Sequence, residues 1–375
     1  MKRIVITGAK GLIGSHTHML LHAENCAAQF KGMSWPYDIQ SLGHAAFLDN
    51  DLLHNALRDA DAVLHFAGVN RADDAAVEAA NPEIADILAR ACKALGVKPH
   101  IVYANSIHAE GDTSYGRSKR IAGEILSGAT ERFTNLILPH IFGEGARPFY
   151  NNVTSTLIHQ LIAGDEAEVN PDGVVHLVHA GRVAQAAVDA VNDKTTGVIK
   201  LSPHSISVPD LYLKLRDFHD HYCTNVYPDL SDPFDLELFN CYRVATYPAG
   251  WPRELKLNSD SRGTLFEAFK CDGGGGQAFF STTAPGVTRG DHFHLKKVER
   301  FLVVKGQATI RIRKVLSDEI WEYKVSGALP APVDMPTLHT HSIENTGTDE
   351  LLTLFWTHDL FDPEHPDTFA DKVLA

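Results

Sequence analysis

The chain has 375 residues, more than one hydrophobic core ordinarily supports, because cores stop growing at about 250–300 residues and longer chains divide into domains. Its net charge of −13, without a basic block or an apolar run of the roughly 20 residues that span a bilayer, excludes nucleic acid and membranes as expected partners. The five cysteines are scattered without a CxxC pair, which excludes a disulfide framework or thiolate zinc site and indicates a cytoplasmic protein.

The first half of the chain alternates short apolar strands with helical stretches. This alternation predicts an α/β fold with a doubly wound parallel sheet of the Rossmann type. The expected strands are residues 2–7, 62–66, 101–104 and 136–138, and the expected helices are residues 12–22, 83–95 and 115–127.

After about residue 250 the pattern changes to short strands separated by glycine, proline or asparagine turns. This pattern predicts an all-β sandwich or barrel. We therefore expect an N-terminal domain of residues 1–250 and a C-terminal domain of residues 251–375, joined by a linker at residues 247–252. The strands expected in the second domain are residues 277–283, 300–304, 308–313, 320–325 and 351–356.

A glycine-rich turn follows the first expected strand directly. Gly8, Gly11 and Gly14 stand in a GxxGxxG spacing, with Leu12 and Ile13 opening the next helix. Glycines at this place allow a tight turn and let the backbone approach a dinucleotide pyrophosphate at the positive end of the helix. Small residues also recur in such turns for packing alone, but the position after the first strand favours a dinucleotide site.

The end of the second strand ordinarily decides between NAD and NADP. An acid about 20 residues beyond the glycines binds the ribose hydroxyls, whereas a basic residue accommodates the 2′-phosphate. Residues 30–34 contain no acid and include Lys31. We therefore expect NADP(H), with NAD(H) as the alternative.

A tyrosine and a lysine stand four residues apart near the start of an expected helix. Tyr115 and Lys119 form a YxxxK motif, and positions i and i+4 share one helix face. A neighbouring ammonium and the positive nicotinamide ring favour the phenolate of a tyrosine, whose free pKa is about 10. Ser106, just after a strand, would hydrogen-bond the substrate carbonyl. An exposed helix that carries both residues by chance is the alternative.

These motifs resemble the extended branch of the short-chain dehydrogenase/reductase superfamily, which acts on nucleotide sugars. Ala67 and Gly68 match its strand end beside the adenosine, and His140 stands where its substrate-side segment usually has an asparagine. Asn81 matches the asparagine that shapes the helix behind the active site, and it can also be a helix N-cap before Pro82. The resemblance implies that the catalytic residues are Asn81, Ser106, Tyr115 and Lys119.

The second domain contains two histidine-rich segments. His292 and His294 are two residues apart and share one face of a strand, Glu299 opens the next strand, and His341 lies in the second segment. Three imidazoles and one carboxylate suit zinc, iron, manganese or nickel. The pattern resembles the cupin superfamily, a jelly-roll fold, and departs from it at Leu338, where a glycine is usual. The alternative is a metal-free cupin whose histidines are acid–base groups or a polar core.

A reductase followed by a cupin resembles the bifunctional epimerase/reductases of bacterial capsule and O-antigen synthesis. The resemblance implies that a zinc-binding cupin epimerises a UDP-2-acetamido-2,6-dideoxy-4-hexulose. We expect C3, next to the ketone, to be the carbon that is inverted. The reductase then uses NADPH to give UDP-2-acetamido-2,6-dideoxy-L-talose, on the route to UDP-N-acetyl-L-fucosamine. The segments that carry the resemblance are residues 8–14, 65–71, 106, 115–119, 290–306, 336–345 and 361–363.

Two other classes of function stay open. The cupin could be a sugar-binding or dimerisation module of a reductase or dehydratase for another nucleotide sugar, which the complete ligand set disfavours. The Rossmann domain could be an inactive nucleotide sensor, which Ser106, Tyr115 and Lys119 disfavour. We expect the protein to form a homodimer and to bind the UDP-sugar as its small-molecule substrate.

Overall fold

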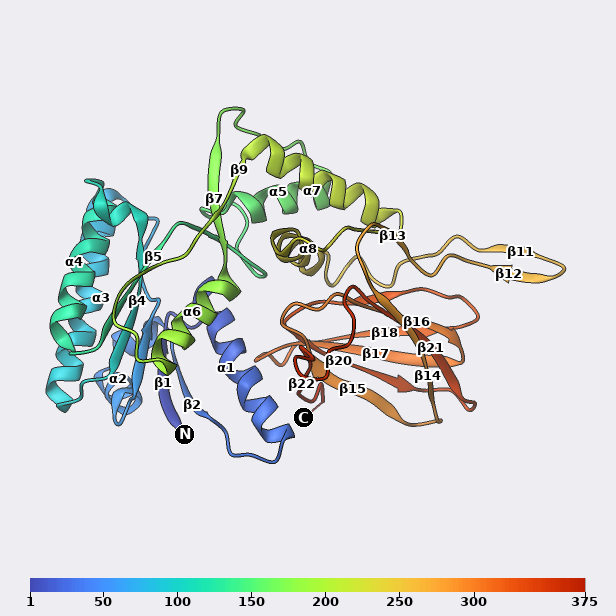
Figure 1. Cartoon of the computed structure of the whole chain (residues 1–375), viewed down its shortest axis with the longest axis horizontal. Coiled ribbons are helices and arrows are strands. Elements are labelled where there is room, and N and C mark those ends of the chain that lie inside the picture. Colours follow the sequence, from blue (N-terminus) through green and yellow to red (C-terminus); the bar gives the residue numbers. More distant parts are fainter. Residues whose placement is uncertain (375) are drawn as a thin grey trace. The chain divides into compact units, whose positions relative to one another are not determined.

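A computed structural model of the chain describes residues 1–374, which group into two units (Figure 1). The first unit consists of Met1–Asn152 and Val174–Ser207, and the second consists of Val153–Gly173 and the chain from Val208 onward. The chain therefore passes between the units three times. Among the described residues, no helix is long and apolar enough to cross a membrane.

A six-stranded parallel sheet forms the centre of the first unit, in the order β2-β1-β3-β4-β5-β8. The strand order reverses between β1 and β3, and in open α/β sheets ligands bind at the carboxyl ends of the strands beside such a reversal. The predicted Rossmann-type sheet is confirmed. The strands are β1 (Lys2–Thr7), β2 (Tyr37–Leu42), β3 (Ala62–His65), β4 (His100–Ser106), β5 (Phe133–Leu138) and β8 (Gly197–Lys200).

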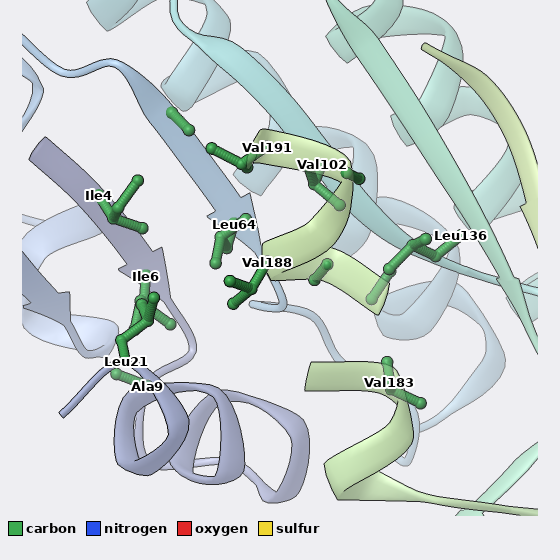
Figure 2. Close-up of a cluster of buried hydrophobic side chains, with 14 of the residues drawn as sticks. Ile4, Ile6, Ala9, Leu21, Leu64, Val102, Leu136, Val183, Val188 and Val191 are labelled. Carbon is green, nitrogen blue, oxygen red and sulfur yellow. The ribbon is translucent and has the colours of Figure 1, made fainter. Parts of the chain in front are cut away.

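Helices cover both faces of this sheet. Ile4 and Ile6 belong to one buried cluster with residues of helices α1 and α6, whereas Val5 belongs to a cluster on the other face. Figure 2 shows the first cluster, in which Leu21 and Val183 project from the two helices toward the strands. The helices of this unit are α1 (Leu12–Phe30), α2 (Asn50–Leu57), α3 (Asp74–Leu95), α4 (Ser114–Ala129) and α6 (Ala180–Asn192).

A smaller sheet of the first unit has the order β6-β7-β9, and two 3-10 helices complete the unit. The pair β6-β7 is parallel and the pair β7-β9 is antiparallel. These elements are β6 (His140–Phe142), β7 (Val174–His179), β9 (His204–Ser207), η1 (His44–Phe47) and η2 (Ile107–Glu110).

Two antiparallel sheets form most of the second unit. Their strand orders are β14-β21-β16-β19 and β18-β17-β20-β15-β22, and every pairing in them is antiparallel. The expected all-β texture is confirmed. The strands are β14 (Gln277–Thr283), β15 (Thr288–Phe293), β16 (Glu299–Lys305), β17 (Gln307–Lys314), β18 (Ile320–Ser326), β19 (Val333–Met335), β20 (His339–Asn345), β21 (Leu351–Thr357) and β22 (Phe369–Ala370).

Three helices that precede residue 250 also belong to the second unit. These are α5 (Val153–Ala163), α7 (Val208–Cys223) and α8 (Pro233–Ala245), and two short strand pairs complete the unit. The short strands are β10 (Val226–Pro228), β11 (Asn258–Asp260), β12 (Gly263–Leu265) and β13 (Lys270–Asp272), where β10 pairs with β13 and β11 pairs with β12.

A buried polar network explains why α7 and β10, which precede the expected boundary at residue 250, belong to the second unit. Asp334 on β19 is fully buried and accepts hydrogen bonds from the hydroxyls of Tyr222 and Tyr227, each at 2.5 Å. The same carboxylate pairs with the buried guanidinium of Arg300 on β16 at 2.5 Å. A buried charge needs all of these partners, so α7 and β10 fold with the sheets that follow them.

Candidate active site and metal centre

The glycine turn lies at the carboxyl end of β1, next to the loop that follows β3. Gly8 has a φ of 66°, and a Cβ added there would lie 2.7 Å from the backbone nitrogen of Ala67. A Cβ added to Gly14 would lie 2.3 Å from the carbonyl oxygen of Gly8. Only glycine fits both places. Gly11 is the N-cap residue of α1, whose first turn carries no acidic residue and so presents an unopposed positive end.

The structure contradicts Lys31 as a cofactor residue. Lys31 is the C-cap residue of α1, a helix of 19 residues, which places it about 28 Å along the helix axis from the glycine turn at 1.5 Å per residue. The second strand, β2, ends at Leu42, whose carbonyl accepts from the amide of Ala9 at 3.3 Å. The residues beside the turn are therefore Gly43 and His44, neither of which is acidic. The polar sequence of β2 hid this strand from pattern analysis.

Ser106 and Tyr115 lie together at the carboxyl end of β4. Ser106 is the last residue of that strand, and Tyr115 lies in the first turn of α4, which Thr113 caps by accepting from the amide of Gly116. Burial raises the pKa of Tyr115, and the nearby Ser106 hydroxyl only partly opposes this shift.

Lys119 is buried one helical turn after Tyr115. Its Nζ donates to the carbonyl of Ala104 at 2.6 Å and lies 4.2 Å from the centre of the Tyr103 ring. Burial lowers the pKa of Lys119 to about 7. The sequence predicts that this ammonium lowers the pKa of Tyr115, but in the structure the pKa of that phenol is raised, because desolvation dominates and Lys119 is directed at a backbone carbonyl.

Asn81 lies in the interior of α3, so its interpretation as a helix N-cap is wrong. The helix begins at Asp74 and Asp73 caps it, accepting from the amide of Ala76. The Asn81 amide instead exchanges two hydrogen bonds of 2.9 Å with the backbone of Val69. It also donates to the Ser118 hydroxyl at 2.9 Å. Asn81 thus ties the loop after β3 to the helix that carries Tyr115 and Lys119.

The loop after β3 approaches the Asn81 side chain closely. A Cβ added to Gly68 would lie 2.7 Å from the Asn81 oxygen, so a side chain there would displace the bond to Val69. The amide of Ala67 donates to the hydroxyl of Thr7 at 3.3 Å. The expected adenosine-side residues therefore sit beside the glycine turn.

The structure adds two features to this unit: the environment of His140 and a cluster around Glu144 that the sequence did not indicate. The Nε2 atom of His140 is buried and has no hydrogen-bond partner among the described residues. Glu144 is buried between His179, whose Nε2 lies 2.8 Å from its carboxylate, and His16, whose Nε2 lies 3.0 Å from its carbonyl oxygen. Burial opposes ionisation of Glu144, but the two imidazoles lower its pKa to about 2. These contacts form a hydrogen-bond network between residues far apart in sequence, which no spacing could reveal.

In the second unit the four predicted metal ligands converge. One ligand atom from each of His292, His294, Glu299 and His341 lies within 4.8 Å of the others. The pairing of β15 with β20 sets His292 opposite His341, and a register shift between Gly290 and His292 re-aims the strand at this point. Glu299, His294 and His341 are buried, and His292 is half-buried.

The hydrogen bonds of the outer ring nitrogens fix the orientation of two imidazoles. The Nδ1 atom of His294 lies 2.5 Å from the carbonyl oxygen of Asp367, and that of His341 lies 3.2 Å from the carbonyl oxygen of His339. A carbonyl only accepts, so each Nδ1 carries a hydrogen, and each Nε2 is the atom that faces Glu299 and could bind a cation. The two Nε2 atoms lie 3.2 Å and 3.3 Å from the Glu299 carboxylate.

This donor set fits a divalent cation. Lone pairs and a carboxylate repel one another unless a positive charge lies among them, and the buried Nε2 of His341 has no hydrogen-bond partner among residues 1–374. Burial lowers the pKa of His292 to about 3, so this ring is neutral as a ligand must be.

Leu338 keeps the backbone conformation that the usual glycine would take. Its φ is 62°, in the left-handed region, and its amide donates to the carbonyl of His294 at 2.8 Å. The departure from the cupin pattern therefore changes the side chain and leaves the turn in place.

Comparison with known proteins gives relatives that span the whole chain. The chain is 29% identical over 382 residues, 99% of each protein, to the UDP-2-acetamido-2,6-beta-L-arabino-hexul-4-ose reductase of Pseudomonas aeruginosa. It is 28% identical over 126 residues to the probable low-salt glycan biosynthesis epimerase Agl13 of Haloferax volcanii, covering 31% of this chain and 81% of that protein. The crystal structure of the capsular polysaccharide assembling protein CapF of Staphylococcus aureus matches with a TM-score of 0.59 at 29% identity, covering 99% of both chains.

Two family descriptions match separate parts of the sequence. The polysaccharide biosynthesis C-terminal domain matches residues 258–369, which contain the four converging metal ligands. The NAD dependent epimerase/dehydratase family matches residues 4–201, which contain the glycine turn, Ser106, Tyr115 and Lys119. Because this second match covers more than half of the chain, the protein belongs to the NAD dependent epimerase/dehydratase family.

Proposed function

We propose that the protein reduces the C4 ketone of a UDP-2-acetamido-2,6-dideoxy-4-hexulose in capsule or related glycan synthesis. Membership of the family implies a nicotinamide cofactor. The substrate class is supported by the full-length similarity to the Pseudomonas reductase. The observation that carries the reaction type is the placement of Ser106 at the end of β4 beside Tyr115 and Lys119 of α4, at the edge of the sheet where the glycine turn lies.

The side chains divide the reduction between them. A bound nicotinamide supplies hydride to C4. Tyr115, which the raised pKa keeps protonated at neutral pH, donates its phenolic proton to the C4 oxygen, so that the ketone becomes a hydroxyl. Ser106 donates a hydrogen bond to the same oxygen, and the Lys119 ammonium stabilises the phenolate that remains. Asn81 holds the helix and loop around them in register.

We infer that the cofactor is NADP(H), with NAD(H) as the alternative. The support comes from the residues after β2, Gly43 and His44, in place of the rejected Lys31. An acidic residue at this position binds both ribose hydroxyls and repels a 2′-phosphate. No carboxylate occurs at residues 43–47, so nothing there disfavours the phosphate.

We further propose that the second unit is a cupin that holds zinc and epimerises the sugar at C3 before reduction. A bound divalent cation would supply an electrophile for the keto oxygen. The C4 ketone makes the proton at C3 acidic. Loss of that proton, followed by addition of a solvent proton to C3 from the opposite face of the ring, inverts the configuration at this carbon. Reduction then removes the ketone and fixes the new configuration as UDP-2-acetamido-2,6-dideoxy-L-talose. The four converging ligands support this proposal.

Deuterium exchange separates the two reactions. With the 4-keto UDP-sugar in deuterated water, Tyr115→Phe is expected to exchange one ring proton without oxidising NADPH. A His292→Ala, His294→Ala variant is expected to bind NADPH and to lose the exchange. If wild-type protein does not oxidise NADPH with this sugar, the reductase proposal fails. If deuterium enters only when Tyr115 is intact, epimerisation belongs to the reductase site and the second unit is a sugar-binding or dimerisation module.

A further inference from the structure

The segment around β22 runs beside β15, the strand that contains His292 and leads directly to His294. Strand β22 pairs with β15, with Ala370 opposite His292 and Phe369 opposite Phe293. The amide of Asp371 donates to the carbonyl of Asp291 at 2.9 Å. Residues 366–373, the tail segment, therefore lie along β15 beside the metal ligands, with Phe369–Ala370 paired into its sheet.

Within the tail segment, Asp367 contacts the loop that joins the ligands His294 and Glu299. Its carboxylate accepts hydrogen bonds from three successive backbone amides, those of Leu295 at 3.1 Å, Lys296 at 3.0 Å and Lys297 at 2.8 Å. These are the residues directly after His294. One side chain more than seventy residues away thus sets the path of the backbone between two ligands.

The main chain of Asp367 contacts a ligand directly. Its carbonyl oxygen lies 2.5 Å from the Nδ1 of His294, and this bond leaves the Nε2 lone pair directed at Glu299, 3.2 Å away. Asp367 has a φ of 41°, a conformation that aspartate and asparagine tolerate better than most residues. The carboxylate bonds to the loop hold this backbone in place, so side chain and carbonyl act together.

We propose that Asp367 is a positioning residue of the metal centre, fixing both the tautomer of His294 and the loop between His294 and Glu299. This inference rests on the proposed metal binding of the second unit. The side chain of Asp367 does not reach the ligand atoms itself; it acts through the backbone.

Other bonds hold the tail segment independently of the Asp367 carboxylate. Arg313 pairs with Asp371 at 2.9 Å, and Thr340 donates to the same carboxylate at 2.7 Å. Lys297 donates to the carbonyl of Pro366 at 2.7 Å. A change confined to the Asp367 carboxylate should therefore leave the tail paired with β15, which separates an effect on the metal from an effect on folding.

The test compares Asp367→Asn with Glu364→Gln in the full-length protein. Asparagine keeps the size and the tolerated backbone conformation, but its NH₂ group faces an amide that needs an acceptor. Glu364 is an exposed carboxylate of the same terminal stretch. Zinc affinity by chelator competition is expected to fall about 10–100-fold in Asp367→Asn and to stay at the wild-type value in Glu364→Gln. The absorption spectrum of the cobalt-loaded variant should also change.

Three outcomes would overturn the inference. Wild-type affinity and an unchanged cobalt spectrum in Asp367→Asn would show that the carboxylate does not position the ligands. A loss of thermal stability in metal-free Asp367→Asn that accounts for its loss of zinc affinity, together with an unchanged cobalt spectrum, would reduce Asp367 to a structural role. If the wild-type protein itself binds no stoichiometric zinc or cobalt, the proposed metal function fails and this inference fails with it. The first two outcomes overturn only the role of Asp367, because in them the wild-type protein still binds the metal.

Discussion

Tyr115 and Lys119 show how burial alters two side chains that the sequence pairs correctly. Desolvation raises the pKa of the phenol and lowers that of the ammonium to about 7. The YxxxK spacing predicts their shared helix face, but not that Lys119 is directed at the carbonyl of Ala104. The spacing of two residues predicts whether they share a helix face. It does not predict which groups of a neighbouring strand they contact.

Replacing Tyr115 by phenylalanine removes one proton donor and little volume. We expect the rate of ketone reduction to fall by about 10²–10⁴-fold, the usual contribution of general acid catalysis, while NADPH binding persists. The measurements are NADPH oxidation and cofactor titration by fluorescence. Tyr212→Phe, in the second unit, is the control and should retain full activity. Near-normal turnover in Tyr115→Phe would remove the phenol from the mechanism.

The lowered pKa of Lys119 predicts how stability varies with pH. Between pH about 7 and the ordinary lysine value of 10.5, the folded state binds fewer protons at this residue than the unfolded state. Stability then rises with pH across this window, by at most about 1.4 kcal/mol per pH unit for one proton. Urea unfolding should show that the wild-type protein gains stability relative to Lys119→Met as the pH rises from about 7 to 10.5. Lys98→Met, at an exposed lysine, should show no such trend. A constant difference between wild type and Lys119→Met would contradict the burial effect.

At the scale of elements, most strands could be predicted and some helices could not be assigned. Apolar runs indicated the central strands of the first unit, because burial on two faces of a parallel sheet selects continuous hydrophobic sequence. The strands of the second unit were indicated by short runs between turn residues. Strand β2, with the sequence YDIQSL, lacks that pattern, and the search for the cofactor-selecting residue therefore ended at Lys31. Helix α3 was expected to start near Pro82, but it runs through this proline from Asp74.

Two glycines, Gly286 in the turn before β15 and Gly290 within that strand, offer a test of element geometry. Gly290 has a φ of 95°, and a Cβ added there would lie 2.8 Å from the carbonyl oxygen of His341. Gly286 has a φ of 74°, with nothing within 4 Å of an added Cβ. Gly286→Ala should cost about 1–2 kcal/mol of backbone strain alone. Gly290→Ala should cost more and weaken zinc binding, as measured by urea unfolding and chelator competition. Equal effects of the two variants would show that the close approach is unimportant.

At the scale of the whole molecule, the division into units depends on a buried charge. Asp334 joins α7 and β10 to the sheets through Tyr222, Tyr227 and Arg300. Sequence texture changes at residue 250, where helices give way to strands, so it locates a change of secondary structure. It cannot locate a change of packing partner, because that depends on contacts between residues more than a hundred positions apart.

Removing Asp334 would leave the Arg300 guanidinium buried without its counter-charge. We expect Asp334→Ala to lower the free energy of unfolding of the second unit by about 3–5 kcal/mol, the usual effect of breaking a buried pair. Urea unfolding followed by tryptophan fluorescence measures this, since Trp356 stacks on Tyr227 with ring centres 4.1 Å apart. Asp318→Ala, at an exposed carboxylate, should change stability little. A loss below about 1 kcal/mol would mean that the network is not needed for the fold.

The three passages of the chain between the units constrain how such a protein is made and how it can evolve. During synthesis, helix α5 leaves the ribosome well before the strands it belongs with, and β8 of the first sheet follows it. Neither unit can be complete when half of the chain has emerged. A gene cut at the change in texture, near residue 250, would give a first fragment with the whole first unit and stranded helices of the second, and a second fragment that lacks part of its core. We therefore expect the two proposed activities to be inherited together, as one reading frame, in preference to being exchanged as separate modules.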